Sequence, residues 1–129
     1  MICTLCYDFL KKDDLIFDEN ETCFYVELPH EILEYSRMIL PKRCAETVFD
    51  LNEEEIKDTF RLLNKHKKRI QDELSPEGFN VGWNCYPTGG QDTPHAHLHL
   101  IPRFSDEPFA GKGIRYWFKS EENCRVTLK

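Results

Sequence analysis

The chain has no apolar run approaching the roughly 18 residues that a membrane-spanning helix needs. It is also short of positive charge, because 17 Lys and Arg stand against 23 Asp and Glu, for a formal net charge of −6. Sequence-independent binding to nucleic acid requires a basic surface, so this composition argues against a nucleic acid partner. No internal repeat and no export signal is recognisable, which leads us to expect a cytoplasmic protein without membrane contact.

The length of 129 residues suits a single domain, residues 1–129, with one core. Apolar residues at 40 % and charged residues at 31 % are typical of a globular protein. Six cysteines, at positions 3, 6, 23, 44, 85 and 124, would suffice for three disulfides. In a chain without export features, however, free thiols and metal ligation are favoured.

Histidine is scarce as well, yet three of the five histidines fall within residues 95–99. Side chains of a strand point alternately to its two faces, so we predict that His95, His97 and His99 share one face. The apolar residues between them would occupy the other face. Neutral imidazole is both a common metal ligand and a nucleophile, and the triplet alone leaves a metal site and nucleophilic catalysis open.

Periodicity predicts four strands besides the triad strand and one long helix. Alternating apolar residues and turn signals place the strands at 15–17, 23–28, 37–40 and 79–85, and the glycine-containing turn 86–90 leads back to the triad strand. The helix is predicted from Asn52, an N-cap with Glu55 three residues later, to Leu74. Its predicted apolar stripe comprises Ile56, Phe60, Leu63, Ile70 and Leu74, and His66 is predicted to be exposed.

Cys3 and Cys6 form a Cys-x-x-Cys pair without the second pair of ligands that would complete a zinc finger. A redox dithiol and two buried cysteines are the alternatives. The pair by itself does not choose among them.

The run from His95 to Ile101 reads His-φ-His-φ-His-φ-φ, where φ is apolar; Gly-Gly-Gln precedes it and Pro-Arg follows. This run resembles the signature of the histidine triad (HIT) family of nucleotide hydrolases and transferases. The resemblance extends from the Cys3-x-x-Cys6 pair to about Arg115, with a C-terminal tail from about residue 105 to 129. It implies an α+β fold, a five-stranded antiparallel sheet with one long helix, and a two-fold homodimer.

The resemblance also implies a mechanism. His97 would attack the α-phosphorus of a purine nucleoside phosphoramidate or dinucleoside polyphosphate, and water would then resolve the covalent nucleotidyl-histidine. His95, His99 and Gln91 would complete the catalytic set. The alternatives are a non-catalytic nucleotide-binding or sensing module and a metallohydrolase that uses all three triad histidines as ligands.

The same resemblance implies where the nucleotide binds. Glu27 would accept the ribose hydroxyls, and the amides of Asn84 and Gln91 would bond ribose or phosphate. Asp92 stands where the family often has Ser or Thr, and a carboxylate can only accept hydrogen bonds. The remaining implied contacts are an apolar cleft for the base near Ile16, Phe17 and Phe24, and phosphate contacts from Lys112 and Arg115.

A structural zinc ion is implied by bacterial family members, where the N-terminal Cys-x-x-Cys, a histidine after Pro-Lys-x and the first triad histidine are ligands. Carried over, the ligands here are Cys3, Cys6, Cys44 and His95. Cys44 replaces the final histidine of the family segment GHxLφφPKRH, but Cys₃His is also an accepted closed zinc set. Ser36 stands where that segment has its first histidine.

Overall fold

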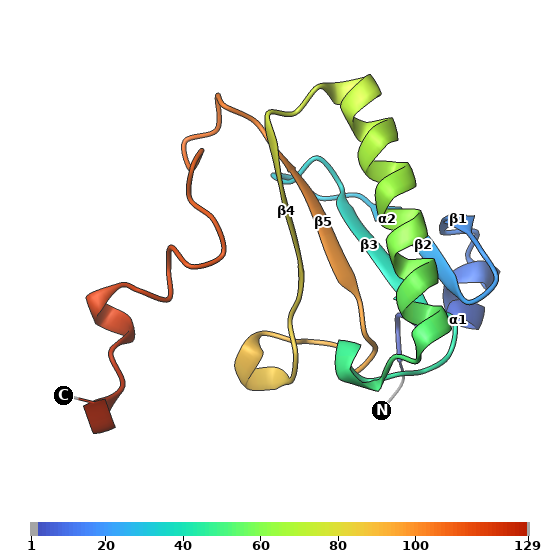
Figure 1. Ribbon diagram of the computed structural model, residues 1–129, viewed down its shortest axis with the longest axis horizontal. Helices are drawn as coiled ribbons and strands as arrows, with labels where there is room; N and C mark the ends of the chain where they lie inside the picture. The colour runs from blue at the N-terminus through green and yellow to red at the C-terminus, as the bar shows by residue number, and fades with distance from the viewer. Residues whose placement is uncertain (1–2, 129) are drawn as a thin grey trace.

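The computed structural model describes residues 3–128 and shows a five-stranded antiparallel sheet with one long helix packed on one face (Figure 1). The helices and strands are α1 (Tyr7–Lys12), β1 (Ile16–Glu19), β2 (Cys23–Leu28), β3 (Ser36–Pro41), α2 (Glu53–Leu74), β4 (Gly78–Trp83) and β5 (Leu98–Arg103), with 3-10 turns at Val48–Asp50, Pro87–Gly89, Glu121–Asn123 and Val126–Leu128. The strand order is β1-β2-β3-β5-β4. The predicted fold class is confirmed. No helix of residues 3–128 is long and apolar enough to cross a membrane.

The strands arise where the alternating patterns predicted them. β1, β2 and β3 form an antiparallel meander, and β4 pairs with β5 from Gly78 opposite Arg103 to Trp83 opposite Leu98. The short helix α1 was not predicted, because six residues carry too little periodicity to reveal a helix. It packs Leu10 onto the sheet and thereby covers the strands β2 and β3 on the side away from α2.

α2 begins and ends as the sequence predicted. The Asn52 side chain accepts from the Glu55 N–H, and the Glu55 carboxylate accepts from the Asn52 N–H, which completes a capping box. After Leu74 the chain turns at Ser75, whose φ of 52° is left-handed. The local signals of capping and turn chemistry therefore fixed both ends of the helix.

The predicted stripe of α2 is wrong in its first half. Ile56 and Phe60 are 42 % and 46 % exposed, whereas His66 is 1 % exposed. The buried face also contains three polar residues from the first two turns: Glu55, Asp58 and Thr59. Each of them has hydrogen-bond partners, so the interface accepts them at little cost. Apolar periodicity misses a helix face that buries paired polar groups.

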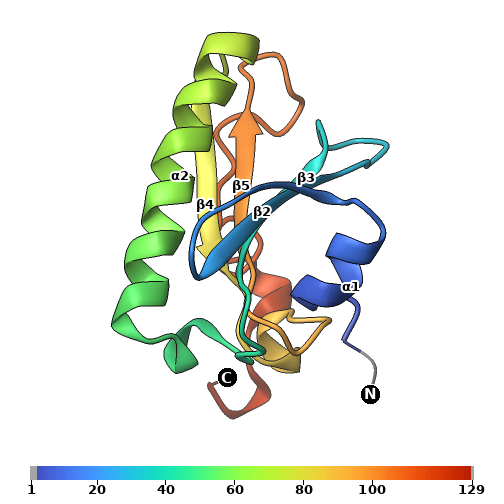
Figure 2. The ribbon, with the colours of Figure 1, turned by 90° about the vertical axis from the view of Figure 1, so that its right-hand side faces the viewer.

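The two faces of the sheet have separate cores. Beneath α2, apolar side chains of β2, β3 and β5 pack against Leu62, Leu63 and Ile70. On the opposite face, α1 and the N-terminal residues cover Phe24, Val26, Met38 and Leu40. The C-terminal segment, residues 104–128, also lies on this opposite side, beyond β4 and β5, as both ribbon views show (Figures 1 and 2).

β5 begins only at Leu98, which corrects the predicted triad strand. His99 lies on β5, but His95 and His97 precede it in an extended segment outside the ladder. The reason is that the N–H of Ala96 donates to the carbonyl of Ala45, in the β3–α2 connection, instead of to a neighbouring strand. His95 and His97 are 0 % and 5 % exposed, so they do not form a free face.

Candidate functional site

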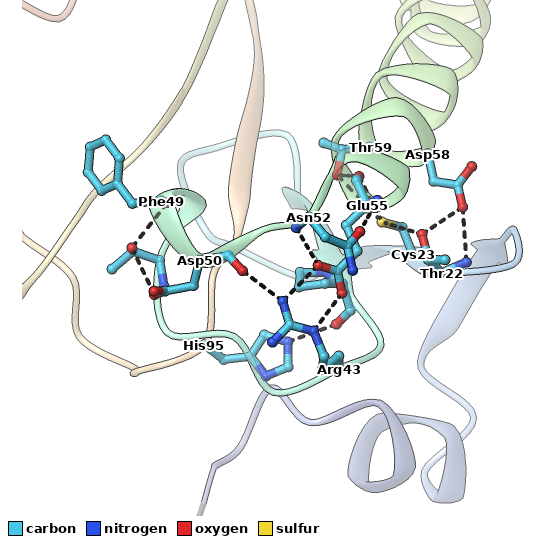
Figure 3. Close-up of polar contacts among 12 residues, drawn as sticks. Thr22, Cys23, Arg43, Phe49, Asp50, Asn52, Glu55, Asp58, Thr59 and His95 are labelled. Carbon is cyan, nitrogen blue, oxygen red and sulfur yellow. Dashed lines mark hydrogen bonds and ion pairs between the residues drawn. The ribbon is translucent and has the colours of Figure 1, made fainter.

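The connection from β3 to α2 is held rigidly by Arg43. Its guanidinium donates to both carboxylate oxygens of Glu55, at 2.8 and 3.0 Å, and to the carbonyl oxygen of Asp50 at 2.7 Å (Figure 3). The hydrogen bonds from Arg43 hold the pKa of Glu55 below its usual value. A two-pronged pair of this kind fixes geometry as well as charge, so the connection is anchored to the first turn of α2.

This connection in turn supports the triad segment. Besides the bond from Ala96 to Ala45 (2.7 Å), the Gln91 amide donates to the carbonyl oxygens of Glu46 (2.6 Å) and Thr93 (3.0 Å). The Gln91 carbonyl accepts from the N–H of Tyr86 at 2.7 Å. Both ends of the Gln91 amide therefore bond to backbone groups and hold two loops together. This geometry favours a structural role for Gln91 over the predicted role in binding substrate.

His95 is fully buried at the junction of the N-terminal segment and β3. Its Nε2 lies 2.9 Å from the carbonyl oxygen of Pro41, and its Nδ1 lies 3.5 Å from Sγ of Cys3. A carbonyl only accepts, so Nε2 carries the proton and Nδ1 turns its lone pair toward the thiol. Burial lowers the pKa of His95, which keeps the ring neutral.

His97 is oriented by the backbone of the same segment. Its Nδ1 lies 2.8 Å from the carbonyl oxygen of His95, which assigns the proton to Nδ1 and leaves Nε2 as the basic atom. Among the described side chains, no buried nitrogen or oxygen lacks a partner, so this unpaired Nε2 is open to solvent. The ring meets that of His99 edge-on at 4.8 Å between centroids. The arrangement suits a nucleophile or a proton acceptor.

His99 faces away from α2. Its partners across the ladder are Gly82 and Met38, and Met38 belongs to the core on the side away from α2. Burial lowers the pKa of this imidazole, and the nearby His97 acts in the same direction. His99 therefore stays neutral near pH 7 and offers either a lone pair or an N–H to a bound group. It is the triad member that lines a cleft.

The cleft beside His99, called here the triad cleft, has a volume of about 840 Å³. Small-molecule sites are typically about 300–1,000 Å³. Its walls come from β4, β5, the start of β3, the loop between β2 and β3, the turns at Val48–Asp50 and Pro87–Gly89, and the C-terminal segment. The residues used below are Asn84, His99, Ile114 and Phe118. Gly90, at φ +95°, faces the Asn84 amide, which would lie 3.6 Å from an added Cβ. The positive φ is what favours glycine here, because other residues rarely adopt it.

Glu27 is not brought to the triad cleft. It lies on the α2 side of the sheet, where its carboxylate accepts from Tyr25 (2.6 Å), Arg37 (3.3 Å) and Arg69. Burial would raise the pKa of Glu27, but the hydrogen bonds and the two guanidinium charges lower it overall. The structure therefore places the predicted ribose ligand on the face away from His99, because side chains alternate along β2.

The predicted base cleft is corrected for the same reason. Phe24 is fully buried in the core beneath α1, and Ile16 packs against that core. Phe17 points to the other face, where its ring meets Tyr25 and His66. Ile16 and Phe17 therefore point to opposite faces of the sheet, and none of the three residues lines the triad cleft.

Three predicted phosphate-site residues lie outside the lining of the triad cleft. Asp92 is exposed, and its charge acts to raise the pKa of His99, against the larger effect of burial. Arg115 lines a smaller cavity that adjoins the triad cleft. Lys112 instead lies over the rings of Phe109 and Tyr116, at 4.8 and 4.9 Å.

Sequence reasoning missed three contributors to the site. Arg43 had a signal, because it lies within the recognised Pro-Lys-Arg-Cys segment. Ile114 and Phe118 had none, since only the folding back of the C-terminal segment brings them to the cleft.

The predicted metal ligands gather at one place. The ligand atoms of Cys3, Cys6 and His95 lie within 4.8 Å of one another, and Sγ of Cys44 is 3.4 Å from Sγ of Cys6. Burial and the neighbouring thiols raise the pKa of Cys6 to about 12. All six cysteines are free.

Comparison with known proteins places this geometry in context. A sequence model of the HIT domain matches residues 11–106. "Protein hit" of Bacillus subtilis is 26 % identical over 89 residues, covering 69 % of this chain and 61 % of that protein. A bis(5'-nucleosyl)-tetraphosphatase (asymmetrical) of Schizosaccharomyces pombe is 32 % identical over 66 residues, 51 % of this chain and 36 % of that protein. The matches thus span less than two thirds of these curated relatives.

Solved structures agree with the sequence matches. A HIT family member from Bacillus subtilis superposes with a TM-score of 0.72 at 26 % identity, covering 82 % of this chain and 76 % of that one. A HIT family protein from Bacillus anthracis gives a TM-score of 0.69 at 26 % identity, over 81 % and 77 % of the two chains. The HIT domain match, residues 11–106, includes the sheet, α2 and the triad segment.

Proposed function

Because the chain belongs to the HIT domain family, we propose that it is a nucleotide hydrolase or transferase that acts at the α-phosphate of a purine nucleotide through His97. The observation that carries the proposal is the fixed tautomer of His97. Its Nδ1–H is held 2.8 Å from the carbonyl of His95, its Nε2 is left unpaired, and its ring contacts that of His99, which lines a cleft of nucleotide size. A relative, adenosine 5'-monophosphoramidase hnt1 of Schizosaccharomyces pombe, is 32 % identical over 76 residues.

The residues divide the reaction into two displacements. Nε2 of His97 attacks the α-phosphorus, and the bond from phosphorus to the leaving group breaks, with the electron pair departing on the leaving group. Water, or another phosphate in a transferase, then attacks phosphorus and the N–P bond returns its pair to Nε2. His99 and Asn84 would donate to the phosphoryl oxygens; neutral donors stabilise developing charge without burying an ion.

The test is trapping of the covalent adduct during turnover of adenosine phosphoramidate and of a dinucleoside tetraphosphate. Wild-type protein should give a phosphorus-labelled histidine, and His97→Ala should lower the rate by about 10⁴-fold. A non-catalytic nucleotide-binding module would bind both compounds without consuming them. A metallohydrolase that used the triad as ligands would lose activity with a chelator, whereas the histidine adduct should form regardless.

We also propose that Cys3, Cys6, Cys44 and His95 hold a structural zinc ion. The donor set fits, because two sulfurs and one imidazole nitrogen lie within 4.8 Å of one another, and Sγ of Cys44 lies 3.4 Å from Sγ of Cys6. The second nitrogen of His95 is held by the carbonyl of Pro41, as metal-bound histidines usually are. The ion would tie the N-terminal segment to the triad segment. Purified protein should contain one zinc per chain by atomic absorption, and Cys3→Ser/Cys6→Ser should lose it and melt at lower temperature. Metal-free protein of unchanged stability would contradict this.

A two-fold homodimer is also proposed, on the family resemblance alone. The mass in solution, measured by light scattering, tests it.

A further inference from the structure

The C-terminal segment is built onto the sheet by Arg103. The guanidinium at the end of β5 donates to the carbonyl oxygens of Phe109 and Lys112, both at 2.9 Å, and its Nε lies 3.0 Å from the Glu107 carboxylate. The HIT domain match ends at residue 106, so the segment anchored here lies outside it. Three bonds from one side chain give the segment a defined path instead of a solvated one.

That path crosses β4 next to His99. A Cβ on Gly82, the residue paired with His99, would lie 3.8 Å from Cδ1 of Ile114. A Cβ on Gly113 would lie 3.7 Å from the Asn80 amide. Both distances are ordinary van der Waals separations, so the segment lies directly against β4.

A second cavity of about 310 Å³ opens where the segment meets β4. It shares Asn80 and Ile114 with the triad cleft, so the two spaces adjoin. Its remaining walls include Arg115 and Lys119. Among the described side chains, neither cation forms an ion pair, whereas Arg103, which anchors the segment, pairs with Glu107.

The charge of this region is opposite to that of the whole chain. Residues 108–120 contain Lys112, Arg115 and Lys119 and no Asp or Glu, whereas the chain carries a net −6. Unpaired cations beside a cavity are suited to bind phosphate, and a guanidinium does so with two parallel bonds. They would also offset the carboxylate of Asp92, which otherwise repels a polyphosphate.

We infer that this second cavity binds the phosphates on the leaving side of the substrate. The inference rests on the proposed function and deepens it: of the two substrate classes, it favours the dinucleoside polyphosphate, whose leaving group is anionic, over the phosphoramidate, whose leaving group is an amine. Arg115 and Lys119 are assigned as the specificity-determining residues.

Binding measured by calorimetry tests this without turnover. The probes are AMP and a dinucleoside tetraphosphate analogue whose bridging oxygens are methylene groups. Arg115→Gln/Lys119→Gln should reduce the affinity ratio of analogue to AMP by about tenfold or more, since a hydrogen bond to a charged group contributes about 1.5–3 kcal/mol. The matched control, Lys67→Gln/Lys68→Gln, removes the same charge from exposed positions on α2 and should leave the ratio unchanged.

Two results would overturn the inference. One is a wild-type protein that binds the analogue no more tightly than AMP. The other is a double variant in which both affinities fall equally, because that would assign the cations to the common site or to folding. Failure of the proposed function is separate: it is absence of turnover and adduct in a wild-type protein that still binds the analogue more tightly than AMP.

Discussion

His66 and His97 lie on opposite sides of the same sheet and differ in what their hydrogen bonds leave free. The Nε2 of His66 bonds Asp18 at 2.8 Å, its Nδ1 accepts from Arg69 at 3.1 Å, and its ring stacks on Tyr25 at 3.7 Å. His97 has one nitrogen held and one free. A buried histidine with both nitrogens satisfied is structural, whereas one oriented by a single bond retains a reactive atom.

The charged groups around the two histidines follow the same division. Beneath α2, the Glu27 carboxylate accepts hydrogen bonds from Tyr25, Arg37 and Arg69, so protein groups already occupy it. Beside the triad, His99 and Asn84 line an open cleft. Similar side chains therefore build a stabilising network on one face and a candidate active site on the other.

Replacing the histidines one at a time should separate these roles most strongly. His99→Ala should lower kcat by about 10²–10⁴-fold, the usual contribution of a positioned acid, base or donor, with little change in stability. His66→Ala should leave kcat nearly unchanged but lower the free energy of unfolding by about 1–3 kcal/mol, because Asp18 and Arg69 lose a buried partner. Steady-state kinetics and urea unfolding of both variants measure this. The comparison fails if His66→Ala impairs catalysis as severely as His99→Ala.

Glu27→Gln tests the closed network directly. The side chain is 15 % exposed and that of Arg37 is 4 % exposed, so removing the charge leaves buried guanidinium groups poorly compensated. Breaking a buried pair of this kind costs about 3–5 kcal/mol. Urea unfolding should show this loss, while KM for the nucleotide in the folded variant should not change. A raised KM with normal stability would restore the ribose contact that the sequence suggested.

The sequence predicted elements whose signals are local. The capping box at Asn52, the strands of the β1–β2 hairpin and the pairing of β4 with β5 were all confirmed. It failed where contacts between distant segments decide. The buried face of α2 could not be read from apolar periodicity, because His66 and Asp58 are buried through partners on β1 and on Thr22.

The candidate site shows the same limit. The triad motif identified the histidines, but their environment depends on the β3–α2 connection, which draws Ala96 out of the ladder. The family pattern suggested Glu27 as a nucleotide contact, yet alternation from the fully buried Phe24 already directs Glu27 to the other face. The wall formed by Ile114 and Phe118 depends on the fold-back at Arg103, for which the sequence has no local signal.

The smallest expected effect is a pH dependence of stability that comes from His66. Burial lowers the pKa of this imidazole, and Arg69 adds to the shift, although Asp18 opposes it. The unfolded chain, with a histidine pKa of about 6.5, then binds more protons than the folded protein, so stability is complete above that pH and declines as the pH falls below it. Protonation would place an N–H on Nδ1 against the Nε–H of Arg69, which removes one hydrogen bond.

Urea unfolding of wild-type protein and His66→Gln at pH 7.5, 6.5 and 5.5 isolates this contribution, because His95 and His99 titrate in both proteins. The stability difference between the two proteins should shrink as the pH falls. Asp18 does not reverse this trend: burial would raise its pKa, but hydrogen bonds from Lys65 and His66 lower it overall, so the stability from this carboxylate is also lost toward acid. A difference that stays constant over this range would mean that His66 gains a proton as readily in the folded protein as in the unfolded chain. In that case the contrast with His97 would rest on hydrogen bonding alone.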